Sequence, residues 1–191
     1  MSNSQQKTTL RRVSSISKTT VWRNLHTADV LLMFLALTIS ITVLLGYRKT
    51  QDGFLSALLW PHAQVVTALY HVPLSYQPGT GYVAAGNHYA IGSACMGINF
   101  IIMLFLLIIC VFVNHYSGFW KIVFFITTFV GSVIIGMITS CIRIIGSIPF
   151  TTLGQFSTIH TGIGITLYLA ALISCYFLTN KITGGIHEQH M

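Results

Sequence analysis

Three residues with complementary chemistry stand at the ends of long apolar segments: Cys95, Arg143 and His160. Cys95 immediately precedes one apolar segment, Arg143 follows the next, and His160 precedes the last. If each segment crosses a bilayer once, chain parity places all three residues at the same membrane face. An additional crossing before Cys95 would move the three together, so this relation does not depend on the orientation.

Each residue type suits one role in nucleophilic catalysis. A thiolate at a helix N-terminus is stabilised by unpaired backbone N–H groups and by the helix dipole. An imidazole can take the thiol proton or give a proton to a leaving amine. Arginine keeps its charge and presents a fork of donors, which suits a developing oxyanion. We therefore expect Cys95 as nucleophile, His160 as general acid–base and Arg143 as oxyanion stabiliser.

The same residues also have structural interpretations. Arg143 could extend to lipid headgroups, because a charge near hydrocarbon is costly unless it is paired or functional. His160 could cap a helix at the interface, and Cys95 could be a small packing residue. Cys141 shares the outer face with Cys95, and an oxidising exterior could join the two in a disulfide.

Metal binding is not expected, because the chain has no C-x-x-C or H-E-x-x-H spacing. The remaining cysteines, Cys110 and Cys175, lie within apolar runs and are expected in the core. The three acidic residues lie outside the long apolar runs, which excludes two-carboxylate, glycosidase-like chemistry. They are Asp29, Asp52 and Glu188.

The elements that must position these residues are membrane helices. The chain has 191 residues, 53% hydrophobic and 7% charged, whereas soluble domains average about 25% charged residues. Its net charge of +7 comes largely from a basic N-terminal cluster that precedes an apolar run. This pattern favours a cytoplasmic anchor on anionic lipid over nucleic-acid binding.

Four uncharged apolar runs predict membrane-spanning helices. At 1.5 Å rise per residue they are long enough, the first with its flanks, to cross about 30 Å of hydrocarbon. The first is followed by Arg48 and Lys49 rather than by a small-residue cleavage site, so we expect a retained helix and not a signal peptide. The runs cover residues 30–46, 96–113, 122–142 and 161–179.

Two further segments lie between the first and second runs. Residues 54–72 are apolar but carry Pro61, His62 and Gln64 near the centre, a pattern typical of an interfacial or re-entrant amphipathic helix. Residues 73–94 have turn signals at 77–79 and 86–88, which predict a short hairpin or extended lid on the membrane.

The expected fold class is an all-α integral membrane protein with about four spans, an interfacial amphipathic helix and a short extracytoplasmic hairpin. Residues 1–27 and 181–191 are expected as cytoplasmic tails around a single catalytic domain, residues 28–180. This orientation places seven basic residues inside and three outside, against six and four if residues 54–72 also spanned.

Small residues recur every four positions in the last two spans and predict close packing of these helices against each other. The alternative is that small residues are simply common in membrane helices. The positions are Ser132, Gly136 and Ser140, and Gly162, Thr166, Ala170 and Ser174.

The segments Ser93-Ala94-Cys95-Met96-Gly97-Ile98 and Cys141-Ile142-Arg143-Ile144, with His160 opening a glycine-containing span, resemble the exosortase/archaeosortase family. The family pattern is a cysteine and, after one residue, a glycine at the start of a span, then an arginine after a later span and a histidine before the next. The resemblance covers roughly residues 54–179 and looks closest to the small exosortase K type. This chain has Ser140 where the family often has asparagine.

The resemblance implies a membrane cysteine protease or transpeptidase that cleaves C-terminal sorting signals, each a short motif, a transmembrane helix and a basic tail. It assigns Cys95 as the nucleophile that forms an acyl-enzyme, Arg143 as oxyanion stabiliser and His160 as general acid–base. It implies the prokaryotic cytoplasmic membrane, an extracytoplasmic site and no cofactor. The expected partners are membrane lipids and substrate proteins whose helix docks laterally.

Two other classes of protein stay open. In a non-catalytic membrane scaffold or assembly protein, the three residues would serve packing and lipid contact. Cys95→Ala separates this class from the enzyme, which would lose processing and keep its fold. A small transporter subunit is less favoured, because no ionisable residue lies in the middle of a span to mark a pathway.

Overall fold

The computed structural model describes residues 27–49, 52–86, 89–153 and 156–188. The expected N-terminal tail and the expected turn residues Asn87 and His88 lie outside these ranges, except that Thr27 begins the first helix. Residues 181–188, expected as part of a C-terminal tail, continue the last helix.

Within the described ranges, four helical segments are long and apolar enough to cross a membrane. This confirms the prediction of a mostly helical chain with the character of a membrane-embedded protein. Short 3-10 turns extend α4 at both ends, η1 (Ser93–Met96) and η2 (Val113–His115). The long helices are α2 (Thr27–Arg48), α4 (Ile98–Phe112), α5 (Phe119–Ser147) and α6 (Phe156–Glu188).

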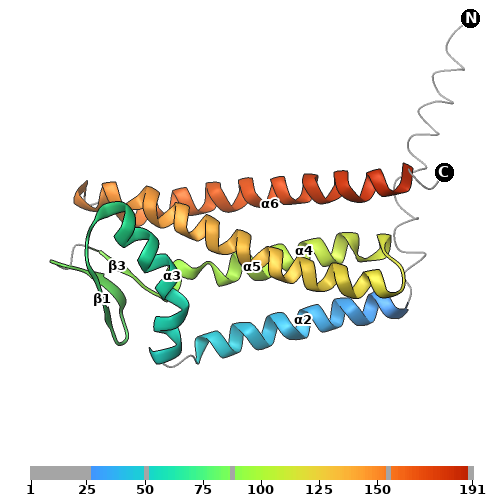
Figure 1. The fold of residues 1–191 in the computed structure, drawn as a ribbon, viewed down its shortest axis with the longest axis horizontal. Helices are drawn as coiled ribbons and strands as arrows, with labels where there is room; N and C mark the ends of the chain where they lie inside the picture. Colours follow the sequence, from blue (N-terminus) through green and yellow to red (C-terminus); the bar gives the residue numbers. More distant parts are fainter. Residues whose placement is uncertain (1–26, 50–51, 87–88, 154–155, 189–191) are drawn as a thin grey trace, which may run out of the picture.

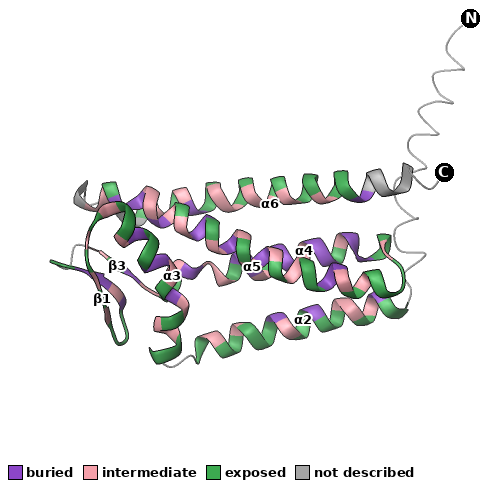
Figure 2. Cartoon of the chain, viewed as in Figure 1, coloured by how far each residue is buried: buried purple, intermediate pink, exposed green. Residues whose placement is uncertain are grey.

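The helix α4 lies at the centre of the bundle. It packs against α2, α5 and α6, and Figure 2 shows buried residues concentrated along it. Phe100, Leu104 and Phe105 are almost fully buried. The outer faces of α2 and α6 instead expose large apolar side chains, including Leu35 and Leu169. Such faces suit a hydrocarbon surrounding rather than water.

The helix α3 (Asp52–Tyr70) lies across one end of this bundle (Figure 1). It is not among the four helices long and apolar enough to span. Pro61 lies inside α3 without ending it. The carbonyl that Pro61 leaves without its helical donor belongs to Ala57, on the exposed face, where solvent or headgroups can supply a donor.

The segment after α3 forms a three-stranded antiparallel sheet in the order β1-β2-β3, where the sequence predicted a hairpin or lid. The predicted turn around Pro78 and Gly79 joins β1 to β2 and brings Tyr76 opposite Tyr82. The third strand then leads into η1, so the sheet connects α3 to the turn that carries Cys95. The strands are β1 (Leu74–Gln77), β2 (Gly81–Ala84) and β3 (Ala90–Ile91).

The helices α5 and α6 pack against each other, as predicted, but the two stripes of small residues do not face each other, which corrects the predicted role of the α6 stripe. On α5 the stripe is buried, and a Cβ at Gly136 would lie 2.2 Å from the Ile101 side chain of α4. On α6 all four small residues are exposed. The bundle-facing side of α6 carries Tyr168 instead, which stacks on Phe100 with ring centroids 4.4 Å apart. The α6 stripe therefore faces away from the bundle.

Candidate functional site

The three predicted site residues lie at the same end of the bundle, beside α3 and the sheet. Cys95 is in η1, Arg143 is in the last turns of α5, and His160 is near the start of α6. Figure 1 shows that these parts of the three elements share one end of the bundle, opposite the α4–α5 connection. The placement agrees with the parity argument.

The Cys95 turn is held by hydrogen bonds at both sides. The Cys95 backbone N–H donates to the Gly92 carbonyl at 2.9 Å, and the Tyr47 hydroxyl of α2 donates to the Ser93 carbonyl. The long helix α4 begins only at Ile98. Cys95 therefore lies before the first turn of α4 rather than within it, and Arg143 is a second source of positive charge that acts on its thiol.

Gly97 has two structural reasons to be glycine. Its φ of 65° and ψ of 26° form the left-handed bend between η1 and α4, a conformation that costs other residues energy. A Cβ there would also lie 2.5 Å from the Ser140 hydroxyl and 2.7 Å from the Tyr168 hydroxyl. The cysteine-x-glycine spacing thus reflects a tight turn pressed against α5 and α6.

Arg143 is the centre of the polar contacts. Its Nη2 donates to the Ala94 carbonyl at 2.9 Å, and its side chain is within electrostatic and hydrogen-bonding reach of the Cys95 thiol. The guanidinium carbon lies 5.2 Å from the ring centroid of Tyr168, in cation–π range. Its stem runs over Gly164, where a Cβ would lie 2.7 Å from the arginine Cδ. Gly164 therefore makes room for the side chain.

His160 is held by a serine of α5. Its Nδ1 lies 2.9 Å from the Ser147 hydroxyl, and that hydroxyl donates its only proton to the Arg143 carbonyl at 2.6 Å. The serine oxygen must then accept from Nδ1–H, which assigns the tautomer. The Nε2 nitrogen carries the lone pair, as a general base requires. Charge from Arg143 also reaches His160.

A partly open cavity of about 380 Å³ adjoins this cluster. It lies over the first turns of α4, between the end of α2 and α6, and Arg143, Tyr47 and Tyr168 contribute to its wall. Ser93, Ala94 and Gly97, which flank Cys95 in sequence, line it as well. Arg143 thus lines the cavity and also acts on the Cys95 thiol, whereas Cys95 itself is not among the lining residues.

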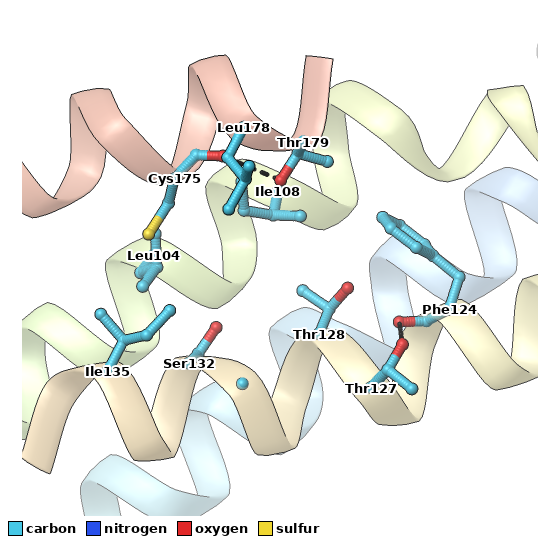
Figure 3. Close-up of a pocket in the computed structure, with 11 residues that line it drawn as sticks. Leu104, Ile108, Phe124, Thr127, Thr128, Ser132, Ile135, Cys175, Leu178 and Thr179 are labelled. Carbon is cyan, nitrogen blue, oxygen red and sulfur yellow. Dashed lines mark hydrogen bonds between the residues drawn. The ribbon is translucent and has the colours of Figure 1, made fainter. Parts of the chain in front are cut away.

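A second cavity of about 200 Å³ lies elsewhere, between α4, α5 and α6 (Figure 3). Its wall is apolar with a few hydroxyls, such as those of Thr128 and Ser132, and with the Cys175 thiol. Neither Arg143 nor the residues around Cys95 line it. Of the three predicted site residues, Arg143 lines the first cavity and none lines the second.

The other cysteines do not compete for this chemistry. None of the four cysteines is in a disulfide, so Cys95 and Cys141 are both free thiols. Cys175 packs against the core as expected, but Cys110 is exposed on the outside of α4, which corrects the prediction that it is a core residue. Across the described part of the chain, no three His, Cys, Asp or Glu side chains are grouped to hold a metal ion.

The sequence did not identify His62 as part of this site. His62 is fully buried on the face of α3 that also buries Leu59 and Val66, and Arg143 acts on it electrostatically. The signal was present, because these three residues recur at helical spacing on one face. Tyr47 and Tyr168 were also missed, and their partners are too distant in sequence for any local pattern to show.

Fold and site together define a class: a membrane-embedded helical bundle with a thiol, a guanidinium and an imidazole at one end. No family model, no curated protein and no solved structure matches the chain. The functional argument is therefore made from the residues and their geometry.

Proposed function

We propose that this protein is an exosortase-like membrane cysteine protease or transpeptidase. It cleaves the C-terminal sorting signals of exported proteins at the outer membrane face through a thioester. The observation that supports this most is the position of Arg143, whose guanidinium reaches the Cys95 thiol, binds the Ala94 carbonyl and lines an accessible cavity. A guanidinium beside a thiol can stabilise the thiolate and the oxyanion formed when it attacks.

The proposed reaction is acyl transfer in two steps. The Cys95 thiolate attacks the scissile carbonyl carbon, a C–S bond forms, and the developing oxyanion accepts hydrogen bonds from Arg143. The C–N bond then breaks, and His160, having taken the thiol proton, gives it to the leaving amine. An acceptor amine, hydroxyl or water attacks the thioester, transfers its proton to His160 and releases Cys95 as thiolate.

The cavity suits a substrate that arrives within the bilayer. Its wall combines the lipid-level side chains Phe100 and Met103 with the polar Asn99 and Arg143. A substrate helix docking beside α2 and α6 would bring the peptide bond just outside the membrane to this wall. The sheet from Leu74 to Ile91, which leads into the Cys95 turn, would shape the exposed part of the peptide groove.

The proposed location is the prokaryotic cytoplasmic membrane, with both termini inside and α3 and the sheet at the outer interface. The α4–α5 connection, followed by Lys121, and the start of α2 lie at the opposite end from the site (Figure 1). In the sequence, five of the ten basic residues precede α2, and by the positive-inside rule this favours a cytoplasmic N-terminus. Residues 28–180 form the single catalytic domain in this proposal.

The experiment is processing of a protein that carries a sorting signal, in cells that express the full chain. Cys95→Ala is expected to abolish processing at normal protein level, because no other described thiol is beside Arg143. The matched control is Cys141→Ala, which removes a free thiol from the same end of α5 and should process normally. Unchanged processing by Cys95→Ala would favour the alternative, a membrane scaffold.

A further inference from the structure

His62 occupies an unusual environment for a polar side chain. Its relative exposure is 0%, and it lies between Leu59 and Val66 on the face that α3 lays against η1 and α5. Neither ring nitrogen has a hydrogen-bond partner of normal geometry among the described residues. Burying an imidazole without partners leaves the cost of removing it from water uncompensated. A packing residue at this position would more simply be apolar.

Arg143, whose charge acts on His62, has a complementary unmet need. Arg143 uses Nη2 on the Ala94 carbonyl, but its Nε is buried and has no partner within the described chain. Burial first, and the Arg143 charge second, lower the pKa of His62, against a smaller opposite effect of the Leu58 carbonyl. The imidazole is therefore neutral at neutral pH and keeps one nitrogen lone pair. An unmet donor and an unmet acceptor thus belong to two groups that already interact.

We propose that His62 is the positioning residue for Arg143, accepting a hydrogen bond from its Nε–H when a substrate carbonyl occupies the site. This inference rests on the proposed function, since it concerns the same oxyanion-binding guanidinium. The incoming oxygen competes with the Ala94 carbonyl for Nη2, the guanidinium turns, and Nε–H is directed at His62. Held at Nε, the planar group presents its remaining donors to the oxyanion in one fixed orientation.

The test compares two reactions of the Cys95 thiol in the purified full chain. Acylation by p-nitrophenyl acetate passes through an oxyanion, whereas alkylation by iodoacetamide does not. Mass spectrometry of the Cys95 peptide gives both rates. His62→Leu is expected to slow acylation about 10²-fold, the cost of a misplaced catalytic group, and to leave alkylation near the wild-type rate. His62→Gln, which keeps an acceptor, should restore most of the acylation.

A double-mutant cycle makes the test specific to Arg143. In the Arg143→Lys background there is no Nε–H to hold, so His62→Leu should add little to the loss. The control is His71→Asn, which changes an exposed histidine directly after α3 and should leave both rates unchanged. If His62→Leu does not fold, His62→Met takes its place with the same expectation.

Three results would overturn the inference: an apolar variant that acylates as fast as wild type, equal slowing of both reactions, or additive losses in the cycle. These outcomes do not depend on a sorting-signal substrate. They are therefore distinct from failure of the proposed function, which would show as normal processing by Cys95→Ala.

Discussion

Arg143 contacts or faces every polar group of the candidate site. It binds the Ala94 carbonyl, reaches the Cys95 thiol, stacks over Tyr168, and exerts its charge on His62 and His160. Arg143 is half-buried, and a charge without a carboxylate partner is costly where its surroundings are apolar. Under the proposed function, this cost has a reason, because an oxyanion would supply the missing negative charge during the reaction.

Arg143→Lys tests the need for a donor fork rather than for charge alone. Lysine keeps the positive charge near the thiol but cannot bind Ala94 and the oxyanion with parallel donors. We expect acyl-enzyme formation to fall about 10²–10³-fold, the usual effect of losing an oxyanion donor. Single-turnover kinetics would measure it, with Arg48→Lys at the end of α2 as control. A loss no greater than the control's would contradict the assigned role.

The buried His62 should make stability depend on pH. Its pKa is lowered in the folded state, so folding favours the neutral form. Its contribution is therefore fully present above the unfolded pKa of about 6.5 and is lost as pH falls from there through the lowered folded value. Thermal unfolding in detergent should show wild type losing more stability between pH 7 and pH 5 than His62→Gln. Equal losses would show that His62 does not titrate on unfolding.

At the scale of single residues, the sequence predicted Cys95, Arg143 and His160 at one membrane face because each stands at a predicted helix end, and the structure has them at the same end of the bundle. Their catalytic roles stay a prediction. The sequence was not sufficient to select His62, since a histidine within an apolar helix was considered only as an argument against a span. Tyr168 and Tyr47 were invisible because cation–π and side chain–carbonyl contacts across helices leave no local pattern. Contacts between distant elements require the packing itself.

At the scale of elements, the η1–α4 bend determines where the thiol lies. Gly97 provides the bend, and α5 and α6 press against it through Ser140 and Tyr168. Ser140, placed where the resembled family often has asparagine, is fully buried with its hydroxyl 3.3 Å from that of Tyr168. Ser140 therefore packs against the bend and Tyr168, rather than positioning Arg143.

Gly97→Ala and Gly118→Ala separate backbone strain from crowding. Both glycines have positive φ, 65° and 54°, but a Cβ at Gly118 would meet nothing within 4 Å. Gly118 combines φ 54° with ψ −133°, so Gly118→Ala should cost only the strain of that backbone region, about 1–3 kcal/mol. Gly97→Ala adds the clash with Ser140 and Tyr168 to left-handed strain of about 1–2 kcal/mol, and should also reduce the reactivity of Cys95. Thermal unfolding and thiol labelling would measure the two effects. Equal destabilisation would show that the contacts around Gly97 relax freely.

The periodicity of the apolar runs was enough to predict the four long helices, because each run is uncharged over its whole length. Periodicity could not tell which face of α6 meets the bundle. Its small residues lie outside, while Tyr168 and Gly164 take the inner face. The first strand of the sheet was missed because Leu74–Gln77 is short and becomes a strand only by pairing with β2.

At the scale of the whole molecule, an ion pair joins α2 to α5 at the end of the bundle opposite the site. Lys121 at the start of α5 pairs with Asp29 at the start of α2, and both side chains are largely buried. The pair connects two helices whose proximity no sequence pattern predicted. It keeps α2 in place along the bundle, and α2 in turn carries Tyr47 to the Cys95 turn.

Asp29→Asn should destabilise the bundle by about 3–5 kcal/mol, because it leaves Lys121 buried without its counter-charge. Adding Lys121→Gln should recover part of the loss, since the double variant has no unpaired charge. The control is Lys181→Gln, which changes an exposed lysine of α6. Thermal unfolding in detergent gives the comparison. If the double variant lost as much stability as Asp29→Asn and Lys121→Gln lose together, the two side chains would not stabilise the bundle as a pair.

The central claim is that Cys95 carries the acyl group of a cleaved sorting signal. The most direct measurement is mass spectrometry of the full chain, quenched in acid during turnover of a substrate with a C-terminal transmembrane signal. We predict an adduct on the Cys95 peptide with the mass of the upstream acyl fragment, removed by neutral hydroxylamine and lost in Arg143→Lys. Turnover with an unmodified Cys95, or an adduct on another residue, would contradict the account.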